Sequence, residues 1–227
     1  MFRFFAIVAA VLLLVAFYPA MAAEKGGLPL VYEDDFEKGA DNWELTDADA
    51  WKLNDNEGGK AFGIITRKSK YKPPHRSPYH IALLKDVAVG DFVLTLKAKS
   101  TLDTGGHRDA CIFFNYQDPA HFYYVHLGKR PDPHSSQIMI VNGAPRKMIT
   151  KNKSPGIPWD DKWHDVKVVR RVKDGTIEVY FDDMDKPVMV AEDKTFGPGR
   201  IGIGSFDDQD DFDDVKLYGK KVEKPKK

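Results

Sequence analysis

The chain has 227 residues and a formal net charge of zero, because 34 lysines and arginines balance 34 aspartates and glutamates. A chain with this balance has no overall field that would draw it to nucleic acid or to an anionic membrane, so neither is expected as a partner. Its single cysteine excludes an internal disulfide. An apolar core or a bound metal must therefore stabilise the fold.

The first residues have the three parts of a secretory signal. Arg3 gives a positive start, residues 6–17 form an apolar run, and Ala20-Met21-Ala22 matches a small-x-small cleavage site. The apolar run is shorter than the roughly 20 residues that span a membrane. We therefore expect residues 1–22 to be cleaved from a secreted or periplasmic protein that has no membrane association afterwards. A retained N-terminal anchor is the alternative.

Short runs of alternating apolar and polar residues follow a linker at 23–29. Side chains of a strand point alternately to its two faces, and residues 91–99 show this period clearly. Turn sequences separate the runs, and no stretch of useful length has a helical period. The pattern predicts an all-β protein, with one antiparallel β-sandwich domain at 30–218 and a basic, disordered tail at 219–227. Strands are expected at 30–37, 51–53, 61–65, 79–84, 91–99, 109–116, 122–127, 137–141, 163–172, 176–181, 188–191, 200–206 and 212–218.

The stretch with the richest chemistry is a predicted β-hairpin, with strands at 109–116 and 122–127. Asp118-Pro119 lies between the strands and is a typical turn sequence. Alternation gives the hairpin one apolar face, made of Ala110, Ile112, Phe114, Tyr123, Val125 and Leu127. The other face combines polar and aromatic side chains, namely His107, Asp109, Phe113, Asn115, Tyr124 and His126. We expect this second face to bind a ligand. An ordinary outer face with satisfied polar groups is the alternative.

Several motifs occur in the order of a known superfamily. Tyr32-Glu33-Asp34-Asp35-Phe36 with Trp43 resembles the opening strand of concanavalin A-like lectin/glucanase domains, and residues 113–127 resemble their hairpin. Residues 163–168, 176–183, 199–204 and 212–217 resemble their closing strands. In particular, the pattern is similar to laminin-G-like and 3-keto-disaccharide hydrolase domains of secreted bacterial proteins. The resemblance implies a jelly roll of two curved sheets, whose concave face holds carbohydrate or another elongated ligand.

The sequence departs from the glucanases of this fold. Their pattern Glu-x-Asp-x-x-Glu places carboxylates along one strand, and a retaining mechanism needs two of them roughly 5 Å apart. No such run occurs, so a retaining glucanase is disfavoured. A histidine beside a carboxylate or a tyrosine can transfer protons near neutral pH, and the expected catalytic residues are His107, Asp109, Tyr124 and His126. The expected ligand-binding residues are Arg76, Phe113, Asn115, Gln137 and Arg146.

Two functions remain open for these residues. Histidines with arginines suit a glycoside hydrolase or lyase that acts on a keto or anionic sugar. The same groups, with an aromatic ring for stacking, suit a non-catalytic, lectin-like carbohydrate-binding module. A laminin-G-like protein-interaction domain is a third, weaker alternative. Carbohydrate is the expected ligand and no organic cofactor is expected. Cys111 is expected to be a small buried residue rather than a nucleophile.

An acidic cluster at residues 207–214 predicts a structural calcium ion, which takes several carboxylate and carbonyl oxygens. In the resembling fold the first and last strands lie together, which implies that Asp34 or Asp35 joins Asp213 around one ion. A solvated acidic turn is the alternative. No HxH or HExxH spacing indicates a transition-metal site.

Overall fold

A computed structural model describes residues 24–56 and 58–222, so the predicted signal peptide at 1–22 lies outside the described residues. The described chain forms fifteen strands and two short 3-10 helices, Ala48–Ala50 and Gly105–His107. Every pairing between these strands is antiparallel. No helix within these two ranges is long and apolar enough to cross a membrane. The expected all-β antiparallel fold is confirmed.

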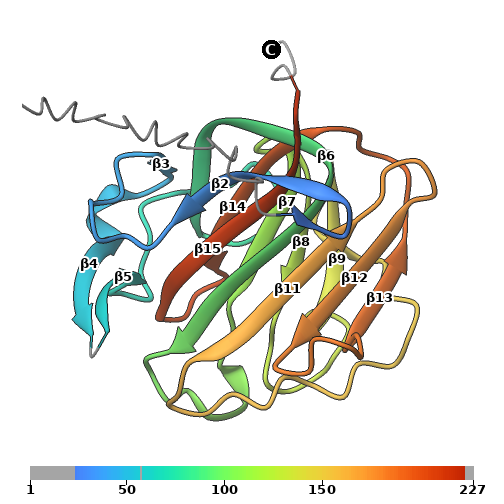
Figure 1. Ribbon diagram of the computed structural model, residues 1–227. Coiled ribbons are helices and arrows are strands. Elements are labelled where there is room, and N and C mark those ends of the chain that lie inside the picture. The colour runs from blue at the N-terminus through green and yellow to red at the C-terminus, as the bar shows by residue number, and fades with distance from the viewer. Residues whose placement is uncertain (1–23, 57, 223–227) are drawn as a thin grey trace, which may run out of the picture.

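One long strand, β6 (His80–Ser100), belongs to both layers of a sandwich. Its first half pairs with β14 (Gly199–Ser205), and its second half pairs with β15 (Asp210–Lys221) and β11 (His164–Arg170). Figure 1 shows the second half in a front layer and β14 in a rear layer behind it. Since β6 passes from one layer to the other, it fixes the position of the two layers relative to each other.

Further strands extend both layers. The front layer has the order β1, β2, β15, β6, β11, β12, β13, and the rear layer has the order β6, β14, β7, β8, β9, β10. The β4–β5 hairpin attaches to the start of β15, and β3 pairs with the first half of β6. Their bounds are β1 (Glu24–Lys25), β2 (Leu28–Asp34), β3 (Trp43–Leu45), β4 (Trp51–Asn56), β5 (Gly59–Ile64), β7 (Cys111–Asp118), β8 (His121–His126), β9 (Gln137–Asn142), β10 (Lys147–Met148), β12 (Thr176–Phe181) and β13 (Met189–Glu192).

The main core lies between the layers and follows from alternation. In β11, the buried residues Val166 and Val168 alternate with more exposed residues. Each such side chain contributes about 1.5–3 kcal/mol when it is fully buried. The rear layer contributes the whole predicted apolar face of the hairpin: Ala110, Ile112, Phe114, Tyr123, Val125 and Leu127. The predicted inward face of the hairpin is therefore confirmed.

A second apolar cluster lies on the opposite face of the rear layer. Its buried members are Ile81, Leu83, Cys111, Phe113, Tyr116, Phe122, Tyr124, Met139, Val141 and Phe206. Tyr71 and Tyr79, from the segment at residues 66–79, pack against this cluster. The ring centre of Tyr79 lies 5.1 Å from that of Phe206. The face that was expected to meet a ligand is therefore partly closed by the protein itself.

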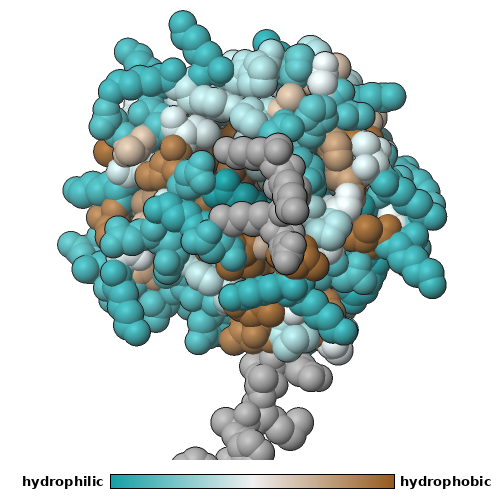
Figure 2. Space-filling view, turned by 90° about the horizontal axis from the view of Figure 1, so that it is seen from above, coloured by the Kyte–Doolittle hydropathy of each residue, from teal (hydrophilic) through white to brown (hydrophobic). Residues whose placement is uncertain are grey.

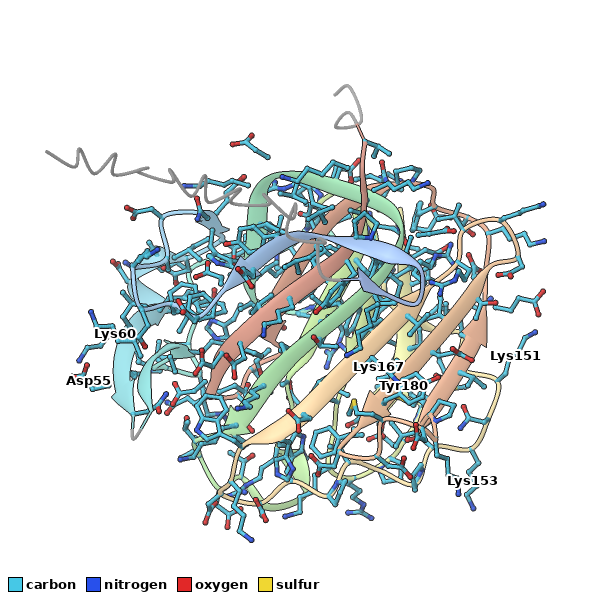
Figure 3. The ribbon with its side chains drawn as sticks, viewed as in Figure 1. Asp55, Lys60, Lys151, Lys153, Lys167 and Tyr180 are labelled. Carbon is cyan, nitrogen blue, oxygen red and sulfur yellow. The ribbon has the colours of Figure 1, made fainter. Side chains whose placement is uncertain are left out.

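Charged residues lie on the outer face of the front layer. Lys167 and Tyr180 pair across β11 and β12, with Lys167 Nζ 3.6 Å from the ring centre, and Figure 3 shows both on this face. Asp55 and Lys60 are cross-strand partners in the β4–β5 hairpin, at the left edge of Figure 3. Figure 2 shows that hydrophilic residues also cover much of the face seen from above. These faces have the character of ordinary solvated surface.

The two ends of the described chain lie in neighbouring strands. β2 pairs with β15, so the expected adjacency of the first and last strands is confirmed. The sheet starts earlier than predicted, because β1 and the start of β2 fall within the linker predicted at 23–29. It also continues to Lys221, because the backbone of the predicted tail at 219–227 pairs with Phe92 and Val89 of β6. Residues 223–227 lie outside the described chain.

Candidate functional site

A pocket of about 390 Å³ opens beside the start of β7 and the end of β8. We call it the arginine pocket. It is lined by Arg67, Arg76, Gly106, His107, Asp109, His126, Arg130, Asp132, His134, Ser135, Arg146, Phe206 and Asp207. It brings together five residues that the sequence predicted as a site: His107, Asp109, His126, Arg76 and Arg146. The fold therefore joins segments that lie up to 70 residues apart in the chain.

Asp109 lies at the inner end of the arginine pocket, where the chain enters β7. Its carboxylate is buried, and Oδ1 accepts hydrogen bonds from Ser205 Oγ at 2.8 Å and from the Phe206 N–H at 2.9 Å. Burial opposes ionisation, but the His126 ring and these two donors together hold the pKa of Asp109 below its usual value. Asp109 is therefore a carboxylate at neutral pH, held rigidly by the loop between β14 and β15.

His126 lies directly beside Asp109 and is enclosed. Its Nδ1 lies 2.7 Å from the carbonyl oxygen of His134, which can only accept, so Nδ1 carries a hydrogen. Its Nε2 is buried 3.4 Å from Asp109 Oδ2 and has no hydrogen-bond partner among the described residues. The Phe206 ring stacks on the imidazole at 5.8 Å. Neither nitrogen of His126 is accessible to a molecule in the pocket as long as Phe206 stays in place.

Arg146 has side-chain hydrogen-bond donors that find no acceptor in the described chain. Its guanidinium lies 4.1 Å from the centre of the Phe206 ring, and its backbone N–H donates to the Arg76 carbonyl oxygen at 3.1 Å. Nε and Nη1 of Arg146 are buried, and within the described chain they find no acceptor. Arg76 lies over the same ring at 5.9 Å. Buried donors without acceptors are costly, so this end of the pocket favours an anionic ligand.

The prediction that an aromatic ring of the hairpin stacks on a sugar is wrong. Phe113 and Tyr124 stack on each other at 5.9 Å, and both have an exposed fraction of 0%. They belong to the second apolar cluster, against which Tyr71 and Tyr79 pack, and because both rings are fully buried neither can stack on a sugar. Burial also raises the pKa of the Tyr124 hydroxyl well above its usual value. The alternation of side chains along the hairpin was predicted correctly. The packing of residues 66–79 against this face was not predicted.

Asn115 does not lie on the predicted face. It has a left-handed φ of 45°, and the pairing of β7 with β8 is irregular between Phe114 and Asp118. This bulge turns Asn115 towards the interior, where its Oδ1 accepts a hydrogen bond from Arg170 Nε at 3.1 Å. Its role is to pair a buried arginine. A bulge of this kind shifts the alternation after Phe114, which a strict period of two does not predict.

Of the remaining predicted site residues, His107 lies at the edge of the arginine pocket and Gln137 lies outside it. Gln137 is the cross-strand partner of His126, and its Nε2 donates to the Asp132 carbonyl oxygen at 2.9 Å. It lines a neighbouring hollow, which shares Asp132 with the arginine pocket, rather than the pocket itself. His107 is exposed at the rim, at the end of the 3-10 helix that precedes Asp109.

Several residues of the arginine pocket were not predicted from the sequence. They are Arg67, Arg130, Asp132, Asp207 and the covering ring Phe206. Phe206 was expected only as the end of a strand. The clustering of basic residues before β6 and after β8 was a signal for Arg67 and Arg130, but only the fold shows which of the arginines meet.

The predicted calcium ligands are only partly available. Asp34 accepts hydrogen bonds at both oxygens, from the Phe36 N–H at 3.0 Å, the Tyr32 hydroxyl at 2.5 Å and Trp43 Nε1 at 2.9 Å. Asp35 and Asp213 line one shared hollow. Burial raises the pKa of Asp213, and the nearby carboxylates Asp214 and Asp35 raise it further. Calcium binding at this place stays a prediction.

Comparisons with known proteins identify the fold. No known family and no curated protein sequence matches the chain. Among solved structures, the carbohydrate-binding module CBM66 from Bacillus subtilis aligns with a TM-score of 0.57 and 16% identity, over 78% of this chain and 96% of that chain. Domain 4 of AbnA, a GH43 extracellular arabinanase from Geobacillus stearothermophilus solved with arabinotriose, aligns at 0.55 and 12%, over 86% and 94%.

A protein of unknown function with a galectin-like fold from Bacillus subtilis is a third similar structure. It aligns with a TM-score of 0.52 and 9% identity, over 86% of this chain and 97% of that chain. At such low identity these similarities concern the fold. They show that the chain has the jelly-roll, galectin-like β-sandwich fold that the sequence predicted.

Proposed function

We propose that this protein is a secreted carbohydrate-binding module, and that its arginine pocket holds the acidic group of an anionic sugar. The observation that carries the proposal is the Arg146 guanidinium, which lines the pocket and whose Nε and Nη1 are buried without an acceptor in the described chain. A guanidinium binds a carboxylate through two parallel hydrogen bonds, which suits a uronic acid. The pocket of about 390 Å³ falls within the range of roughly 300–1,000 Å³ for small-molecule sites.

The charges of the pocket support an anionic ligand. Four arginines line it against three carboxylates. One of these carboxylates, Asp207, lies 3.9 Å from Arg67 Nη2, and another, Asp109, is already occupied by protein donors. The excess of unpaired guanidinium groups lies on the side of Phe206, where Arg76 and Arg146 meet.

The fold neighbours support carbohydrate as the ligand class. One of them is a carbohydrate-binding module, and another was solved in complex with arabinotriose. Binding is favoured over catalysis because Phe206 covers His126, whose two nitrogens are not free to exchange protons with a ligand. The resemblance to laminin-G-like and 3-keto-disaccharide hydrolase domains is compatible with such a module.

The proposal is tested by calorimetric titration with pairs of oligosaccharides that differ only in a carboxylate at C6. The acidic member of a pair should bind about ten- to a hundred-fold more tightly, the expected contribution of a charge-assisted hydrogen-bonded pair. Arg146→Gln should remove this preference. Arg171→Gln, which changes an arginine outside the pocket, should leave it intact. Equal affinity for acidic and neutral sugars, or an unchanged preference in Arg146→Gln, would contradict the proposal.

A second candidate function is a hydrolase or lyase acting on the same acidic sugar. The observation that favours it is the buried pair of Asp109 and His126 beside the pocket, with Nε2 to Oδ2 at 3.4 Å. Such a pair acts as a proton carrier if Phe206 moves aside on binding. The same oligosaccharides, incubated with the protein and followed by mass spectrometry, distinguish the two. Shortened or unsaturated products that disappear in His126→Gln would favour the enzyme.

A further inference from the structure

We propose that Asp109, Cys111 and His126 form a zinc(II) site at the inner end of the arginine pocket. Within residues 24–56 and 58–222, they are the one set of three histidine, cysteine or acidic residues whose ligand atoms all lie within 4.8 Å of one another. Carboxylate, thiolate and imidazole are each established zinc ligands. The proposal is independent of the proposed function, because it concerns groups below Phe206 rather than the arginines above it.

The local structure explains why the three side chains converge. Cys111 and His126 are direct partners across β7 and β8, and partners of this kind have Cβ atoms about 4.5–5.5 Å apart. Asp109 lies two residues before Cys111 and therefore points to the same face. Cys111 Sγ lies 4.0 Å from Asp109 Oδ1, which completes the triangle. Strand pairing thus creates a set of ligands that no short sequence motif contains.

His126 is oriented as a metal-binding histidine is. Its Nδ1–H donates to the His134 carbonyl oxygen at 2.7 Å, which leaves Nε2 as the ligand atom. A hydrogen bond from the second ring nitrogen to a backbone carbonyl is the usual support of a metal-ligating histidine. Nε2 points at the other two ligands, is buried, and has no hydrogen-bond partner in the described chain. This unpartnered nitrogen is the second, independent observation that indicates a ligand.

The distance between Nε2 and Asp109 Oδ2 fits a bridging ion better than a direct contact. At 3.4 Å it is longer than an ordinary N–H···O hydrogen bond. Bonds of about 2.0–2.1 Å from zinc to nitrogen and oxygen, at the tetrahedral angle, separate these two atoms by about 3.3–3.4 Å. A zinc ion between them would therefore need little movement of either side chain.

The charge at the site balances once the ion is bound. Burial raises the pKa of Cys111 well above its usual value, so the metal-free site holds a neutral thiol beside the Asp109 carboxylate. Zinc binding releases the thiol proton to solvent. The resulting Zn²⁺, carboxylate, thiolate and neutral imidazole sum to zero, so the occupied site has no net buried charge. Three protein ligands leave a fourth position for water.

The test uses the mature chain without a histidine tag. After equilibration with zinc and dialysis, elemental analysis should find about one zinc per chain. Cobalt(II) in place of zinc should give a cobalt–thiolate charge-transfer band, and this band reports on Cys111 because the chain has a single cysteine. The band should be lost in Cys111→Ser. It should persist in the control His121→Gln, which changes a histidine at the other end of β8.

A second measurement keeps the proposal testable if Cys111→Ser does not fold. X-ray absorption on the zinc-loaded wild-type chain should show one sulfur ligand at about 2.3 Å and nitrogen or oxygen ligands at about 2.0–2.1 Å. A chain that retains no zinc, or zinc without a sulfur neighbour, would overturn the proposal. A cobalt band that survives in folded Cys111→Ser would overturn it as well.

Discussion

The outer face of the rear layer has two ends, and they differ in what covers them. At one end, Phe113 and Tyr124 belong to the second apolar cluster, against which Tyr71 and Tyr79 pack, and neither ring has any exposure. At the other end, the same strands continue into the arginine pocket, where Nε and Nη1 of Arg146 have no acceptor in the described chain. Both ends belong to the same face of the β7–β8 hairpin, and the same alternation of side chains places residues on it. The difference shows that alternation assigns a side chain to a face, while the covering segment decides whether that face is core or site.

The covered end should be core, which predicts the largest effect. Phe113→Ala should lower the free energy of unfolding by about 3–5 kcal/mol, because it leaves a cavity in a fully buried cluster. Arg146→Ala at the open end should change it by no more than about 0.5 kcal/mol. Urea denaturation of both variants measures the difference. Similar losses at both ends would show that the arginine pocket is structural.

Two buried carboxylates near the open end predict opposite dependences on pH. The pKa of Asp109 is lowered, so its stabilisation is present above the unfolded value near 3.8 and is lost as the pH falls through the lower folded pKa. The pKa of Asp210 is raised well above 3.8, first by burial and then by Asp109 and Asp208. Its folded state keeps the proton, so stability falls as the pH rises from 3.8 through the folded pKa.

Melting temperatures at mildly acidic and at neutral pH test these signs. Asp210→Asn should gain stability over the wild type as the pH rises, while Asp109→Asn should be destabilised at neutral pH and should approach the wild type only in strong acid. Two variants that shift in the same direction with pH would contradict the assignment.

The segment at residues 66–79 should act as a cover. Tyr71→Ala should cost about 1–2 kcal/mol, less than Phe113→Ala, because Tyr71 is only half-buried. It should also increase the binding of a hydrophobic dye, since the second apolar cluster becomes exposed. Lys72→Ala is the matched control on the exposed side of the segment. Unchanged dye binding in Tyr71→Ala would show that the segment does not close this face.

The smallest expected effect concerns the predicted calcium ion at Asp35 and Asp213. Millimolar calcium should raise the melting temperature by a few degrees over EDTA, because an ion that binds only the folded state stabilises it by mass action. Asp213→Asn should remove the increase. Asp34→Asn should lower stability with or without calcium, since Asp34 accepts three hydrogen bonds from the protein. The same melting temperature in calcium and in EDTA would exclude the ion.

Much of the fold could be predicted, because it depends on local periodicity. The alternation of Ile112 and Phe114 against Phe113 assigned both hairpin faces correctly, and the pairing of β2 with β15 followed from the resemblance. The position of Asn115 could not be predicted, because a bulge shifts the period by one residue.

The candidate site was predictable only in part. Asp109 and His126 were expected together because they share a face, whereas Phe206 and Arg67 come from segments that only the tertiary fold brings near. Cys111 and His126 meet through strand register, which no spacing along the chain expresses. Chemistry within one hairpin was thus accessible from the sequence, but contacts between distant loops were not.

The most direct test of the central claim is a crystal structure of the protein with a uronic acid oligosaccharide. The sugar should occupy the open end of the hairpin face, with its carboxylate within hydrogen-bond distance of the Arg146 guanidinium and with Phe113 and Tyr124 still buried. A sugar bound elsewhere on the molecule, or a sugar that displaces residues 66–79 to stack on Phe113, would contradict it.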